Sequence, residues 1–156
     1  YAALDEAQRI FEGLSSPMVV EALLRRAQSF KLQGRLREAQ AELADILDRC
    51  KANDRERNPT CLAALATIAE VAGSNGDIEV ALAHSERALA LIAEELGDHT
   101  DEYAQALLGR AIALEGSGRA EEASALRRQR HAVLRALYGD EHPFVRSVAA
   151  AMGSAD

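Results

Sequence analysis

The 156-residue sequence predicts an all-α protein, a solenoid of antiparallel helix hairpins. The first observation is a 42-residue period, at which glycine and alanine recur: Gly34, Gly76, Gly118 and Ala39, Ala81, Ala123. The second is the apolar i, i+4, i+7 spacing before each of these glycines, as in Leu23, Ala27 and Phe30, which is typical of a helix with one buried face. We therefore expect similar hairpins stacked side by side, each in contact with its neighbours.

The period divides the chain into consecutive units of one array, 1–156. We expect the sequence to begin within a repeat, so that residues 1–16 form the second helix of a truncated unit. Full repeats follow over 17–58, 59–100 and 101–142. Residues 143–156 then form a terminal first helix or cap.

The first helix of each repeat is expected over 17–32, 60–74 and 102–116, and each start carries a recognisable signal. Pro17, Pro59 and Asp101 open the repeats, and a residue that suits an N-cap precedes each of them: Ser16, Asn58 and Thr100. A glycine then ends each first helix in the left-handed conformation. This pattern predicts a chain reversal after each first helix.

Second helices are expected to begin near Leu36, Ile78 and Ala120 and to run to about 52, 95 and 138. Each carries an alanine that we expect to face an alanine of the preceding first helix: Ala27, Ala69 or Ala111. Two small side chains let the helix backbones approach closely, which predicts tight packing within each hairpin.

These offsets, together with the turn Leu-Tyr-Gly-Asp-Glu-His-Pro at 137–143, resemble the tetratricopeptide repeat. The 42-residue spacing is similar to the longer variant of kinesin light chains and many bacterial signalling proteins. The resemblance covers Tyr1 to Met152 and implies a right-handed superhelical α-solenoid that serves as an interaction scaffold. The paired asparagines by which kinesin light chains hold cargo are replaced by Leu24-Arg25, Ala66-Thr67 and Leu108-Gly109, so cargo-type clamping is not carried over.

The resemblance also implies that the first helices line a concave face. The residues expected to bind a partner there are Glu21, Leu24, Gln28, Lys31, Ala63, Ala66, Glu70, Gly73, Gln105, Leu108, Ile112 and Glu115. We expect Ala63, Ala66 and Gly73 to form a depression that receives a peptide with an apolar anchor and a basic group near Glu70. The alternative is a mildly apolar groove that binds nothing or touches a flanking segment of its own protein.

The functional hypothesis is a scaffold or adaptor module that binds a protein or peptide, as part of a larger bacterial regulatory protein. The alternative is a peptide-sensing domain whose curvature changes when the ligand binds. An enzyme is not expected, because carboxylate pairs such as Glu94-Glu95 point apart on a helix. The exposed ends of the array also favour a homodimer formed by stacking end on end.

Charge and composition argue against other partner classes. The net charge of −7 counts against nucleic acid, and no apolar run reaches the roughly 20 residues that span a bilayer. No metal or cofactor is expected, because none of the four histidines has another His or Cys three or four residues further along the chain, as a metal site on a helix would require: His84, His99, His131 and His142. His142 is expected instead to tie its turn to the next helix start.

Two cysteines flank the first loop between repeats, Cys50 and Cys61. They are interpreted as buried and reduced, in preference to a redox latch, and a cytoplasmic setting is expected. Arg127, Arg128 and Arg130 lie on a second helix and are expected to be solvated on the convex side.

Overall fold

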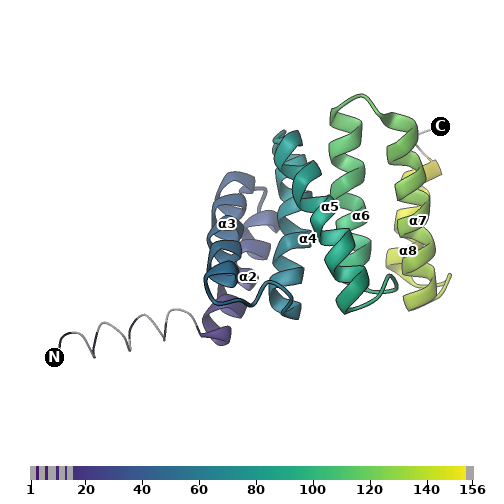
Figure 1. The fold of residues 1–156 in the computed structure, drawn as a ribbon. Helices are drawn as coiled ribbons and strands as arrows, with labels where there is room; N and C mark the ends of the chain where they lie inside the picture. The colour runs from purple at the N-terminus through teal and green to yellow at the C-terminus, as the bar shows by residue number, and fades with distance from the viewer. Residues whose placement is uncertain (1–2, 4–5, 7–9, 11–12, 14–15, 154–156) are drawn as a thin grey trace.

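The computed structural model describes residues 3, 6, 10, 13 and 16–153. Over residues 17–153 the regular elements are all helices: α2 (Pro17–Leu32), α3 (Leu36–Ala52), α4 (Pro59–Ser74), α5 (Ile78–Glu95), α6 (Asp101–Gly116), α7 (Ala120–Tyr138) and α8 (Pro143–Gly153). Figure 1 shows the hairpins following one another in chain order, with α2 and α3 at one end and α7 and α8 at the other. The predicted all-α solenoid is confirmed, whereas most of the helix expected over 1–16 lies outside the described residues.

Side-chain caps fix the starts of the first helices. In each repeat the predicted cap accepts a hydrogen bond from a backbone N–H of the first turn: Ser16 from Met18 at 3.2 Å, Asn58 from Thr60 at 3.0 Å and Thr100 from Tyr103 at 3.2 Å. A cap of this kind satisfies one of the N–H groups that the helix cannot pair internally. The predicted helix starts are therefore confirmed.

Left-handed residues end the first helices. Gly34, Gly76 and Gly118 have φ of 72°, 87° and 80°, as predicted. The loop between α3 and α4 has no glycine, and Asp54 takes the left-handed conformation there with φ of 52°. Aspartate tolerates this region better than most residues because its short side chain can hydrogen-bond locally.

Each hairpin buries an alanine on each of its two helices. The three facing pairs predicted above are all 0% exposed: Ala27 and Ala39, Ala69 and Ala81, and Ala111 and Ala123. Larger apolar side chains such as Leu43, Ile46 and Leu62 fill the space between successive hairpins and are likewise fully buried. Each hairpin thus buries one face against the next, as a solenoid requires.

The first helices do not all approach one another equally. A Cβ built on Gly109 of α6 would lie 2.7 Å from the backbone nitrogen of Glu70 in α4, so the two backbones are nearly in contact. Between α2 and α4 the position 42 residues before Gly109 is Thr67, and these helices share far fewer contacts. The close backbone approach that a glycine permits is therefore found between α4 and α6.

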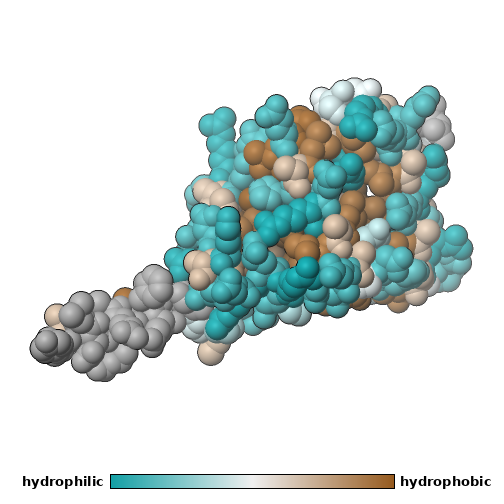
Figure 2. All heavy atoms as spheres, viewed as in Figure 1, coloured by the Kyte–Doolittle hydropathy of each residue, from teal (hydrophilic) through white to brown (hydrophobic). Residues whose placement is uncertain are grey.

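The surface over these helices is mixed in character. Figure 2, in the same view as Figure 1, shows mainly hydrophilic residues with apolar residues in patches between them. Two of the exposed apolar side chains belong to second helices, Val80 at 37% and Leu137 at 39% exposure. Single exposed apolar residues of this kind are ordinary on a protein surface.

Candidate partner-binding face

A row of polar contacts crosses the first helices. The Nζ of Lys31 in α2 donates to Oε2 of Glu70 in α4 at 2.9 Å, and Nε2 of Gln105 in α6 donates to the same oxygen at 3.0 Å. The hydroxyl of Thr67 donates to the carbonyl of Ala63 at 2.7 Å beside this row. Three of the expected partner-binding residues are therefore joined to one another across three hairpins.

This row changes the expected role of Glu70. A basic group of the ligand was expected near its carboxylate, but Lys31 already supplies that charge from within the chain. The ion pair is largely shielded, since the side chains of Lys31 and Glu70 are 23% and 18% exposed. A ligand that offered a cation here would have to displace Lys31.

The expected depression is also different in the structure. Ala66 is 0% exposed, and a Cβ built on the buried Gly73 would lie 2.9 Å from Cγ2 of Ile112. Leu24, which was expected to flank the depression, is only 7% exposed. These small residues are used for close helix packing, so the interpretation of Ala66 and Gly73 as an open floor is wrong.

The remaining expected residues keep some accessible surface. Gln28, Ala63, Leu108 and Ile112 are half-buried, whereas Glu21 and Glu115 are exposed. Both exposed carboxylates are engaged within their own hairpins: Glu21 with Arg25 at 2.7 Å, and Glu115 with Arg127 at 2.9 and 2.7 Å. The accessible part of the expected face is therefore the polar row with Ala63, Leu108 and Ile112 beside it.

Arg130 departs from the expected convex, solvated position. It is half-buried, and its Nε is buried without a hydrogen-bond partner among the described residues. Its guanidinium carbon lies 5.7 Å from the ring centroid of Phe144 in α8. Its equivalents 84 and 42 residues earlier, Ile46 and Ala88, are both 0% exposed. A comparison of these equivalent positions in the sequence would have shown that Arg130 places a charge where the other repeats have an apolar residue.

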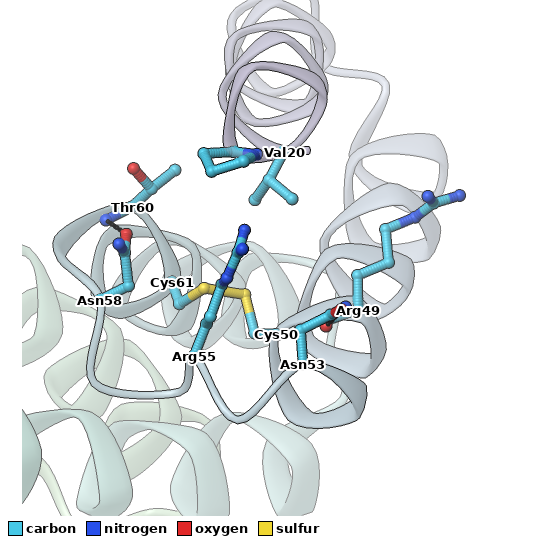
Figure 3. Close-up of a pocket in the computed structure, with 9 residues that line it drawn as sticks. Val20, Arg49, Cys50, Asn53, Arg55, Asn58, Thr60 and Cys61 are labelled. Atoms are coloured by element: carbon cyan, nitrogen blue, oxygen red, sulfur yellow. Dashed lines mark hydrogen bonds between the residues drawn. A yellow bond between two sulfur atoms is a disulfide. The ribbon is translucent and has the colours of Figure 1, made fainter. Parts of the chain in front are cut away.

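The cysteines form a disulfide, which corrects the expectation of reduced thiols. Cys50 of α3 and Cys61 of α4 are joined by an S–S bond of 2.01 Å and are 2% and 4% exposed. Figure 3 shows the bond in a small hollow that Val20 and Arg55 also line. Stable disulfides are typical of oxidising compartments, so the bond does not support the expected cytoplasmic setting.

The histidine expected to tie the last turn does so. Nδ1 of His142 accepts a hydrogen bond from the backbone N–H of Phe144 at 3.2 Å, at the start of α8. Within residues 16–153 and the four described residues before them, no group of three or more His, Cys, Asp or Glu residues is placed to hold a metal ion. A search of the same part of the chain finds no helix with the length and apolarity needed to cross a bilayer.

Comparisons with known proteins agree with this architecture. Residues 60–136 match the family model of the tetratricopeptide repeat. A protein of Podosopora anserina, described as carrying kinesin light chain nearly identical TPR-like repeats, matches with a TM-score of 0.72 and 22% identity, over 85% of this chain and 63% of its own. BtubC (BKLC) from P. vanneervenii matches with a TM-score of 0.68 and 21% identity, over 92% of this chain and 57% of its own.

The chain thus spans less than two thirds of the length of either solved structure. At these identities the likeness establishes the shared fold. Comparison with curated proteins gave no match.

Proposed function

Because this chain carries a tetratricopeptide repeat domain, we propose that it binds a peptide or partner helix on the face formed by α2, α4 and α6, as an adaptor within a larger regulatory protein. Repeats of this family generally mediate protein–protein interaction, and the repeated first helices form an extended surface suited to that role. The observation that carries the proposal is the row formed by Lys31, Glu70 and Gln105, which continues across all three helices.

In this proposal the polar row orients the bound peptide, and the residues beside the row make apolar contacts with it. Leu108 lies one turn from Gln105 on α6 and is half-buried, so it keeps surface that a ligand can cover. Ala63 lies one turn before Thr67 on α4 and is also half-buried. A few apolar contacts beside fixed hydrogen-bonding groups are the usual composition of a peptide-binding groove.

A library of random 12-residue peptides displayed on phage tests this proposal. Selection on the wild-type protein should enrich a common sequence pattern, and Leu108→Glu should abolish that enrichment because it places a charge on the proposed face. Leu137→Glu is the matched control, because Leu137 is an exposed leucine of α7, a second helix. Equal selection by Leu108→Glu and the wild type would refute binding on this face.

One observation favours peptide sensing as a second candidate. The α2 helix contacts α4 much less than α4 contacts α6. The first hairpin is therefore packed less extensively against the second hairpin than the second is against the third. A peptide that bridges α2 and α4 would then alter the angle between the hairpins. Small-angle scattering with and without a selected peptide separates the two candidates, since an adaptor keeps its profile and a sensor changes it.

A further inference from the structure

Arg130 occupies a position that the two preceding hairpins fill with apolar side chains. Ile46 and Ala88, its equivalents in α3 and α5, are 0% exposed, whereas Arg130 brings a guanidinium into the region where α7 meets α8. An ionised group in such a place loses hydration and destabilises the fold unless an opposite charge compensates for it. An arginine at this position therefore requires an explanation.

The carboxylate that acts on Arg130 is already engaged. Burial lowers the pKa of Arg130, the attraction of Glu70 raises it, and the nearby Arg127 lowers it. Oε2 of Glu70 accepts hydrogen bonds from both Lys31 and Gln105, and Arg127 is paired with Glu115. Among the described residues Arg130 has no ion pair of its own.

The surroundings of Arg130 suit an anion that also carries an apolar group. The Phe144 residue is 44% exposed, and its ring lies beside the guanidinium at a distance that allows a cation–π interaction. A planar guanidinium binds a carboxylate through paired hydrogen bonds, and partial removal from water strengthens such a bond. Glu70, whose negative charge attracts Arg130, is the central residue of the polar row.

We propose that Arg130, with Phe144 beside it, is an anion site that binds a carboxylate of the peptide held on the face of α2, α4 and α6. The proposal rests on the proposed function and reverses the charge first expected of the ligand. An acidic side chain is selected because Lys31 already neutralises Glu70, while Arg130 is left without a partner.

The test extends the phage selection to two variants of α7. The wild-type protein should enrich peptides that carry Asp or Glu at a fixed spacing from an apolar residue. Arg130→Met should still select peptides but lose the acidic preference. Arg128→Met is the matched control, because Arg128 is an exposed arginine two residues away on the same helix, and it should keep that preference.

Synthetic copies of one selected peptide make the measurement quantitative. Replacement of its acidic residue by the corresponding amide should weaken binding to the wild type by roughly tenfold or more, the size expected for a charge-assisted hydrogen bond. The same replacement should leave binding to Arg130→Met unchanged. Circular dichroism establishes that the variant is folded, and its thermal midpoint should rise because a desolvated charge has been removed.

The outcomes separate the two proposals. Selection of peptides without acidic enrichment, or acidic enrichment that survives Arg130→Met, overturns the anion site and leaves the binding face standing. Failure of the wild type to select any peptide overturns both. If Arg130→Met does not fold, the Nε–Hε resonance of Arg130 in the wild type serves instead: a shift when the acidic peptide is added, and none with the amide peptide, supports the site, and no shift with either overturns it.

Discussion

Lys31 of α2 and Glu70 of α4 form an ion pair with an N–O distance of 2.9 Å. The equivalent residues one repeat later, Gly73 of α4 and Ile112 of α6, are in close apolar contact. The same geometric site is thus bridged by charge in one place and by apolar packing in the next. Because Gly73 has no Cβ, Ile112 and α6 can come close to α4. A lysine cannot be packed in that way, and its charge is instead satisfied by Glu70.

The Lys31–Glu70 pair should contribute measurably to stability. A double-mutant cycle with Lys31→Met and Glu70→Gln is expected to give a coupling free energy of about 1 kcal/mol, at the upper end for ion pairs that keep contact with water. Urea unfolding of the four proteins measures it. The Arg25–Glu21 pair is the control, since its side chains are 76% and 54% exposed, and it should show no resolvable coupling. A Lys31–Glu70 coupling equal to that of the control would contradict the prediction.

Close contact between α4 and α6 predicts that Gly109→Ala destabilises the protein. The added methyl group would meet the backbone of Ala69 and Glu70, which cannot yield without moving the helix, and the expected cost is about 1–3 kcal/mol. Thermal or urea unfolding measures the loss. Gly116→Ala is the comparison, because its methyl group would meet only the flexible side chain of Ile78. The prediction is wrong if Gly116→Ala proves as harmful as Gly109→Ala.

The disulfide predicts that a reductant lowers stability. The cross-linked residues are 11 apart in sequence, and a loop of this length corresponds to roughly 3 kcal/mol in the chain-entropy model. Unfolding in urea with and without a phosphine reductant should show the difference. The double variant Cys50→Ala, Cys61→Ala should be less stable and insensitive to the reductant. An identical midpoint for the wild type in both conditions would argue that the bond adds nothing to stability.

His84 predicts that the free energy of unfolding decreases as the pH falls below the ordinary histidine pKa of about 6.5. Burial, and then the positive charge of Arg87, lower the pKa of His84 below its ordinary value. The unfolded chain therefore binds the proton more readily than the folded protein. The contribution of His84 to the free energy of unfolding has its full value above about pH 6.5, and it decreases as the pH falls from there towards the lowered pKa.

His84→Gln should flatten this dependence, as followed by urea unfolding at several pH values. The exposed carboxylates Glu38 and Glu122 have pKa values lowered chiefly by hydrogen bonds from Arg35 and Arg119, so they titrate at more acidic pH than an ordinary histidine. If the variant keeps the slope of the wild type, another group causes the effect.

Most of the helical architecture could be predicted from the sequence, because its signals are local and repeat. Caps such as Asn58, the left-handed Gly118 and the paired alanines act within a few residues of their own helix. The 42-residue spacing then fixes which helices are equivalent. Nothing beyond the period and short-range stereochemistry was needed for these elements.

The details of the candidate face depend on contacts between repeats, which the period does not reveal. Offset alone placed Ala66 and Glu70 on one accessible face, but α6 lies so close to α4 that Ala66 is buried and Gln105 reaches Glu70. Pairing of Cys50 with Cys61 likewise depends on how α3 meets α4 in space. Sequence spacing was compatible with both paired and separate thiols.

The bond between Cys50 and Cys61 spans the loop at 53–58, where Asp54, Arg55 and Arg57 are exposed. A protease that cuts this loop would therefore leave two fragments in one covalent molecule. Such a nicked protein would migrate as a single species on a non-reducing gel and separate into two only after reduction.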